Sequence, residues 1–219
     1  GVVDFDPGAG TQNRSAGYTE PRCFLASYTN TGGYRFATML AGTGGIGGNA
    51  LDVDAANNVY LAGLFSGTQD MDPSGATANL STPNPGVYAV FLASYDSSGA
   101  YRFARKIAGT GTVESAGLAV DEAGNSFLVG HFQQSADFDD SDGEDGADTI
   151  PSAGGRDGYV AGYTAAGAIR FAFGIGGPLT ESVAGVAVDG DGHIHVTGSA
   201  AEGADFDPGA GVALPVVSP

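Results

Sequence analysis

Short runs in which apolar side chains alternate with polar or small ones recur along the whole chain. Gly, Asn, Asp and Pro separate these runs. A period of two residues is typical of half-buried β-strands, and the separating residues are those that tight turns require. No segment combines a helical period with capping residues. The pattern therefore predicts an all-β protein made of many short antiparallel strands.

The runs are of four types, which follow one another in a fixed order. The first is an apolar run that ends in Tyr, and the second has the pattern Arg-Phe-Ala. The third and fourth form a hairpin whose turn contains Asn or Gly, which supply the backbone angles that short turns need. One set comprises Val90–Tyr95, Tyr101–Ala104, Leu118–Asp121 and Phe127–Gly130. We expect the four strands of such a set to form one sheet.

An Asp-rich motif gives the period of the repeat. Asp4-Phe5-Asp6-Pro7-Gly8 returns in similar form at Asp70, Asp137 and Asp205, so the steps are 66, 67 and 68 residues (70−4, 137−70 and 205−137). A period this regular predicts structural units that bury each other's apolar faces. The predicted units are 4–69, 70–136 and 137–204, with a partial unit 205–219, in a single repeat domain that spans 1–219. We expect each motif to lie at the junction between successive sheets.

Several of these segments together resemble a known repeat. The Asp-Phe-Asp-Pro-Gly motif, the runs Phe91–Asp96 and Tyr101–Ala104, and the hairpin Ala119–Asn125 look like the bacterial seven-bladed β-propeller repeat family (SBBP repeats). The resemblance covers almost the whole chain. It implies propeller-like blades of four strands, in large exported or cell-surface proteins that mostly have no assigned activity.

The number of units differs from that of a closed propeller. About three units are present, whereas a closed propeller usually has 4–8 blades. The partial unit 205–219 matches residues 4–18 and stops before the next strand. This pattern indicates either a slice of a longer tandem array or copies of the chain that associate, because open terminal sheets need a partner. We expect self-association, as a homo-oligomer or a filament.

The net charge of the chain argues against some classes of binding partner. The chain has 25 acidic and 8 basic residues, a net charge of −17. Nucleic acid and anionic membranes both need clustered positive charge, so neither is an expected partner. No apolar run is long enough to span a membrane. The lone cysteine, Cys23, lies in an apolar run and is expected to be a small buried side chain rather than a nucleophile.

The Asp motifs are the best candidates for chemistry. Two carboxylates one residue apart, followed by a turn, can place several oxygen ligands around Ca²⁺. Asp side chains also cap turns by accepting hydrogen bonds from backbone N–H groups, and both interpretations stay open. The denser acidic segment 137–148 is either a solvated loop or a second cation site. The candidate metal ligands are Asp4, Asp6, Asp70, Asp72, Asp137, Asp139, Asp205 and Asp207.

Arginine and histidine give weaker signals. Arg35, Arg102 and Arg170 occupy one position of the repeat. We expect them to pair with the hairpin carboxylates Asp54, Asp121 and Asp189, although a ligand-binding ring of arginines is an alternative. His193 and His195 share one face of a predicted strand, but the sequence identifies no third metal ligand beside them.

No nucleophile or phosphate-loop motif stands in a suitable structural context. The sequence therefore predicts a non-catalytic structural or adhesive repeat protein that self-associates, located outside the cell or on its surface. A Ca²⁺-dependent propeller module that binds glycans is the first alternative. A hydrolase built on the same scaffold is the second, because a fold does not determine a function.

Overall fold

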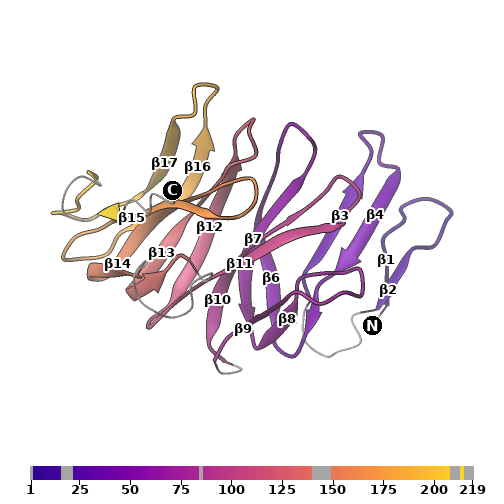
Figure 1. Cartoon of the computed structure of the whole chain (residues 1–219), viewed down its shortest axis with the longest axis horizontal. Coiled ribbons are helices and arrows are strands. Elements are labelled where there is room, and N and C mark those ends of the chain that lie inside the picture. The colour runs from indigo at the N-terminus through magenta and orange to yellow at the C-terminus, as the bar shows by residue number, and fades with distance from the viewer. Residues whose placement is uncertain (1, 16–21, 84–85, 140–148, 208–212, 215–219) are drawn as a thin grey trace.

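The computed structural model describes residues 2–15, 22–83, 86–139, 149–207 and 213–214, and these residues form strands, turns and loops (Figure 1). The all-β fold class is confirmed. Within the described residues, no helix has the length and apolar character needed to cross a membrane. Every pairing between two strands is antiparallel.

The strands are β1 (Val2–Asp4), β2 (Asn13–Ser15), β3 (Phe24–Tyr28), β4 (Tyr34–Met39), β5 (Ala41–Gly42), β6 (Ile46–Val53), β7 (Val59–Ser66), β8 (Thr68–Asp70), β9 (Asn79–Ser81), β10 (Tyr88–Tyr95), β11 (Tyr101–Gly109), β12 (Val113–Val120), β13 (Ser126–Asp137), β14 (Thr149–Tyr163), β15 (Ile169–Ile175), β16 (Ser182–Val188), β17 (Ile194–Ser199) and β18 (Ala213–Leu214).

Two complete four-stranded sheets form the centre of the molecule. The first contains β6, β7, β10 and β11 in this order, and the second contains β12, β13, β14 and β15. The end of β11 pairs with the end of β13, which joins the two sheets at one corner. The short strand β18 pairs with β15 at the outer edge of the second sheet.

A two-stranded sheet lies on each side of this pair. β3 and β4 precede the first complete sheet, and β16 and β17 follow the second one (Figure 1). In the repeat, β3 and β4 correspond to the third and fourth strands of a complete sheet. β16 and β17 correspond to its first and second strands. The described residues therefore form two complete sheets and two different half-sheets, besides the small sheets β1–β2 and β5–β8–β9.

The sheets are out of phase with the units expected from the sequence. We expected the four strands of unit 70–136 to pair with one another, but β10 and β11 belong to the first sheet, while β12 and β13 begin the second. Only residues 110–112 link β11 to β12, and Gly109 and Gly111 lie there close to backbone carbonyl groups of the β13 edge. The chain crosses between sheets at this glycine-rich link, because β-carbons would collide with that edge.

Successive sheets bury each other's faces, as the repeat predicts. The fully buried side chains of Tyr60 and Leu92 in the first sheet pack in one cluster with Phe132 and Tyr163 of the second. A second cluster joins β3 and β4 to the first sheet, and a third joins the second sheet to β16. Cys23 lies buried in the second cluster, as expected, and burial raises the pKa of its thiol to about 11.

A repeated contact, here called the clasp, connects β3–β4 to the first complete sheet and the first complete sheet to the second. The Arg35 guanidinium donates a hydrogen bond from Nη2 to the carbonyl oxygen of Ser97, 3.1 Å away, in the β10–β11 turn. One sheet further on, Arg102 Nη2 donates to the carbonyl oxygen of Ala165 in the β14–β15 turn, also at 3.1 Å. The neighbouring phenylalanine rings cover the glycines of the same two turns: Phe36 covers Gly99, and Phe103 covers Gly167.

This clasp corrects the predicted role of the arginines. Among the described residues, no ion pair joins Arg35, Arg102 or Arg170 to a hairpin aspartate, and Arg170 instead lies over the ring of Phe127. Burial raises the pKa of Asp54, but hydrogen bonds from Asn58 and Ala56 and the charge of Arg102 outweigh it and hold that pKa below its usual value. The guanidinium binds a backbone carbonyl instead, because each of these turns presents one to the arginine of the preceding sheet.

The clasp predicts different costs for two glycine substitutions. Gly167 and Gly192 both lie in turns with positive φ, 82° and 83°. An added Cβ at Gly167 would lie 2.5 Å from Phe103, whereas one at Gly192 meets nothing within 4 Å. We expect Gly192→Ala to lower the free energy of unfolding by about 1 kcal/mol through backbone strain. Gly167→Ala should cost about 2–4 kcal/mol, because it adds overpacking. Denaturant titration measures both, and equal losses would contradict the clasp.

Candidate functional site

The Asp motifs lie where one sheet meets the next. In the chain, the motifs at Asp70, Asp137 and Asp205 lie at or after the end of the second strand of a sheet, β7, β13 and β17. In space, Asp70 pairs with Ala41 and Asp137 pairs with Ala108, so the motif extends the sheet at the end of a preceding fourth strand. Asp205 forms the equivalent bridge with Gly176. The prediction that the motifs occupy junctions between sheets is thus confirmed for these three copies.

The carboxylates of these motifs accept hydrogen bonds from backbone N–H groups. Asp4 Oδ1 accepts from the N–H groups of Gln12 at 2.8 Å and Asp6 at 3.0 Å, and these bonds lower the pKa of Asp4. Asp70 Oδ1 repeats this pattern with Asp72 and Ala78, both at 3.0 Å. The second aspartate of each pair caps the following turn in the same way. The turn-capping interpretation therefore describes what these side chains do in the structure.

The residue between the two aspartates plugs the core. Phe5, Met71 and Phe138 are buried, and the carbonyl oxygen of each accepts a hydrogen bond from a tyrosine hydroxyl. The donors are Tyr28, Tyr95 and Tyr163, with oxygen–oxygen distances of 3.1, 3.0 and 3.0 Å. Phe206, in the fourth copy, is exposed, and no described residue supplies its tyrosine.

Calcium binding by the Asp motifs stays a prediction. Among the described residues, none of the eight candidate aspartates belongs to a group of three potential ligands. Ca²⁺ needs six to eight oxygen ligands, and one Oδ1 atom of each pair already binds backbone N–H groups. Residues 140–148 of the acidic segment, and Pro208 and Gly209 of the fourth motif, lie outside the described residues.

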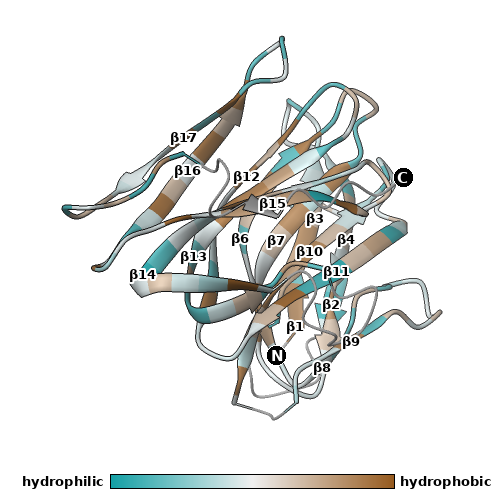
Figure 2. Cartoon of the chain, turned by 60° about the vertical axis from the view of Figure 1, so that its left-hand side comes forward, coloured by the Kyte–Doolittle hydropathy of each residue, from teal (hydrophilic) through white to brown (hydrophobic). Residues whose placement is uncertain are grey.

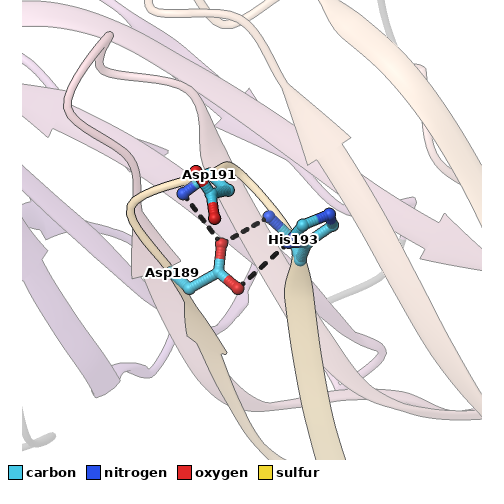
Figure 3. A group of neighbouring side chains, drawn as sticks. All are labelled: Asp189, Asp191 and His193. Carbon is cyan, nitrogen blue, oxygen red and sulfur yellow. Dashed lines mark hydrogen bonds and ion pairs between the residues drawn. The ribbon is translucent and has the colours of Figure 1, made fainter.

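The group that the structure does bring together is Asp189, Asp191 and His193 (Figure 3). They lie in the β16–β17 turn, and one possible ligand atom of each is within 4.8 Å of the others. Asp189 Oδ2 is 3.0 Å from His195 Nε2 and 3.1 Å from His193 Nδ1. The bond to His195, followed by those to His193, lowers the pKa of Asp189. All four side chains are exposed.

The other hairpins explain the origin of this group. Asp54 Oδ2 accepts a hydrogen bond from the Asn58 side-chain amide at 2.7 Å, and Asp121 accepts the same bond from Asn125. His193 occupies the asparagine position in β16–β17, so an imidazole replaces an amide in the turn cap. The sequence places His193 and His195 on one strand face but does not indicate a third ligand beside them. Comparison with the asparagines of the two other hairpins would have identified Asp189 as the carboxylate that contacts both histidines.

A second acidic feature was missed by sequence analysis. A groove of about 270 Å³ is lined by glycines together with Asp157, Asp205 and Asp207. Asp157 is buried, and burial, followed by the charge of the buried Glu181, raises its pKa. Glu181 occupies the position at which the two complete sheets have an apolar side chain, Ile46 or Val113. The raised pKa of Asp157 favours its neutral, protonated form over a carboxylate that would bind a cation.

The hydrogen bonds from the tyrosine hydroxyls to the Asp motifs predict how much each of these bonds contributes to the free energy of unfolding. Tyr95→Phe removes the hydroxyl that binds the Met71 carbonyl in a fully buried setting. We expect it to lower the free energy of unfolding by about 1–3 kcal/mol, because the carbonyl is left without a partner. Tyr28→Phe is the matched control, since Tyr28 is 43% exposed and water can replace its hydroxyl. Urea unfolding of both variants tests this, and a loss at Tyr28 as large as that at Tyr95 would contradict it.

Comparison with known proteins gives no external guide to these features. No protein-family model matches the chain, and no curated protein matches it. The internal repeats supply the comparison instead, because each position of a sheet occurs two or three times in one molecule. Differences between equivalent positions are therefore the most informative observations, and the largest of them separate the half-sheets from the complete sheets.

Proposed function

We propose that this chain is a non-catalytic structural or adhesive repeat protein, located outside the cell or on its surface, that self-associates. The observation that carries the proposal is the exposure of the half-sheets. Phe24 of β3 is 56% exposed, whereas Phe91, at the equivalent position of β10, is fully buried. Val196 of β17 is 40% exposed, whereas its equivalent in β7, Leu61, is 4% exposed.

These side chains belong to positions that a complete sheet buries. Most residues of β7 and β10 are buried, whereas every residue of β17 except Ile194 is exposed. Figure 2 shows hydrophobic residues, coloured brown, along β16 of the terminal hairpin. Strands with open edges and apolar side chains readily pair with other chains. A partner that covered them would bury the surface that the complete sheets bury within one molecule.

Composition supports the rest of this proposal. The net charge of −17 keeps a protein with exposed edges soluble and disfavours nucleic acid as a partner. Location outside the cell, and membership of the SBBP repeat family, rest on the motifs that resemble that family. The most buried aromatic rings, such as Tyr60, Phe91 and Phe132, lie between sheets. This distribution favours an assembly module over a protein that presents aromatic rings to glycans.

A Ca²⁺-dependent glycan-binding module is the second candidate. The clustered Asp189, Asp191 and His193 favour its cation-binding part, as do the paired carboxylates of the Asp motifs.

Self-association predicts species larger than the 21.7 kDa chain. We expect sedimentation velocity to detect a reversible increase in mass as protein concentration rises, because the exposed half-sheets bury apolar surface on association. High salt should strengthen the association by screening the net negative charge. A sample that stays monomeric up to millimolar concentration, at low and at high salt, would overturn the proposal.

Calcium binding predicts a metal-dependent stability. If the Asp motifs hold Ca²⁺, adding it should raise the melting temperature, because a ligand that binds the folded state stabilises that state. Excess EDTA should reverse the rise, and Asp72→Ala should reduce it. Asp96→Ala is the matched control, because Asp96 caps an ordinary hairpin turn outside the motifs. If EDTA changes neither melting temperature nor assembly, the calcium candidate is wrong.

A further inference from the structure

We propose that two copies of this chain complete one four-stranded sheet between them, with β17 of the first copy paired antiparallel to β3 of the second. This inference rests on the proposed self-association and specifies its geometry. β16 and β17 are the first two strands of a sheet, and β3 and β4 are the last two. Among the described residues, β17 pairs only with β16 and β3 pairs only with β4. Each half-sheet therefore offers the edge that the other lacks.

The complete sheets define the register of this pairing. Tyr95, which ends β10, lies opposite Val59, the first residue of β7. In the second sheet, Tyr163 lies opposite Ser126, the first residue of β13. Two independent sheets thus follow the same rule. Applied to the half-sheets, the rule places Tyr28 of the second copy opposite Ile194.

The same register fixes the next contacts along the two strands. Val196 lies opposite Ala26 of the second copy, as Leu61 lies opposite Ala93 in the first sheet. Side chains of one strand alternate between faces, so Phe24 and Tyr28 of the second copy share a face with Val196. That face is the one through which the equivalent Phe91 and Tyr95 pack on the preceding sheet. The exposed apolar side chains of both half-sheets therefore come together.

The two parts of one further clasp lie at opposite ends of the molecule. Phe36 and Phe103 each cover the glycine of the next turn, but an added Cβ at the equivalent Gly32 would meet nothing within 4 Å. Phe171, the third phenylalanine of this series, has no described turn to cover. When the second copy docks, its Gly32 lies beneath Phe171 of the first copy, as Gly99 lies beneath Phe36 within one molecule. Arg170 then faces the Asn30 carbonyl, as Arg102 faces that of Ala165.

Charge is complementary across the completed sheet. In the first sheet, Arg102 lies close enough to the hairpin carboxylate of Asp54 to lower its pKa, and it donates to Ser94 Oγ at 2.8 Å. Arg35 already has this orientation, because it donates to Ser27 Oγ at 2.9 Å. Its hairpin carboxylate would be Asp189 of the first copy. The pairing therefore places a positive side chain of the second copy beside the carboxylate of the β16–β17 turn.

Docking also replaces the Asp motif that begins at Asp205 with the identical motif that begins at Asp4 of the second copy. Residues 4–10 and 205–211 have the same sequence, Asp-Phe-Asp-Pro-Gly-Ala-Gly. In one molecule, the Asp205 N–H donates to the Gly176 carbonyl oxygen at 2.7 Å. In the assembly, Asp4 of the second copy takes this position. The exchange favours the incoming loop, because its Phe5 is buried and held by Tyr28, whereas Phe206 is exposed.

A charge placed on β17 tests this interface. Val196→Lys leaves the side chain in water in the single molecule but buries an ammonium group in the completed sheet. We expect the apparent dissociation constant of self-association to rise at least about tenfold. Val87→Lys is the matched control, since Val87 is also 40% exposed but lines a groove between the two complete sheets, away from β3 and β17. It should leave association unchanged. Equal effects of the two substitutions would overturn the proposed interface.

Disulfide trapping tests the register. In a Cys23→Ala background, a chain with Ala26→Cys is mixed with a chain with Val196→Cys and oxidised. Opposite residues of antiparallel strands are close enough for a disulfide, so a covalent dimer of the two chains should form. Ser27→Cys replaces Ala26→Cys in the control, because its side chain lies on the other face and should not react with Val196→Cys.

The outcomes separate the two proposals. Association without the 26–196 disulfide, and without an effect of Val196→Lys, would overturn the split sheet while self-association stands. A double variant that forms this disulfide within one chain would show closure on itself and would also overturn the split sheet. A wild-type chain that is monomeric at every concentration would overturn self-association itself.

Discussion

Burial of one sheet against the face of the next is the interaction on which the rest of this structure depends. A single sheet cannot cover its own faces, and its apolar side chains, such as Tyr60 and Phe132, lie between sheets. Close packing of the faces brings turns and loops of neighbouring sheets into contact, where buried carbonyl groups need donors. The repeated arginine and tyrosine hydrogen bonds supply these donors at fixed positions. Further sheets can be added to such a fold, because each outermost face also needs a sheet to cover it.

The sequence predicted the features that depend on local pattern. Alternating apolar positions predicted the strands, and the period of the Asp motif predicted repeated sheets with buried faces. We also expected the central residue of each of the four motifs to be buried in the core: this is confirmed for Phe5, Met71 and Phe138, but it is wrong for Phe206, which is exposed. Cys23 is also buried, directly before the apolar strand β3. These are properties that a few neighbouring residues determine.

Features that depend on which strands pair were not predictable in the same way. Only residues 110–112 separate β11 from β12, whereas residues 67–87 separate β7 from β10. Proximity in the chain favours grouping β11 with β12, yet the ladder joins β7 to β10. The partner of Arg102 is a carbonyl group of the next sheet, 63 residues away, and no local pattern indicates it. The group around Asp189 was hidden because histidine replaces asparagine only in that hairpin.

The offset between the four-stranded sheets and the sequence units also determines what kind of contact two copies can make. If the sheets coincided with the units 70–136 and 137–204, two copies would meet face to face, through apolar surfaces that tolerate several registers. Because the sheets are divided instead, each half presents an edge of backbone donors and acceptors. A shift of one residue at such an edge would turn Val196 and its neighbours to the opposite face, so a single register is favoured. Edge pairing between half-sheets would therefore specify the order and spacing of copies, which face packing alone would leave undetermined.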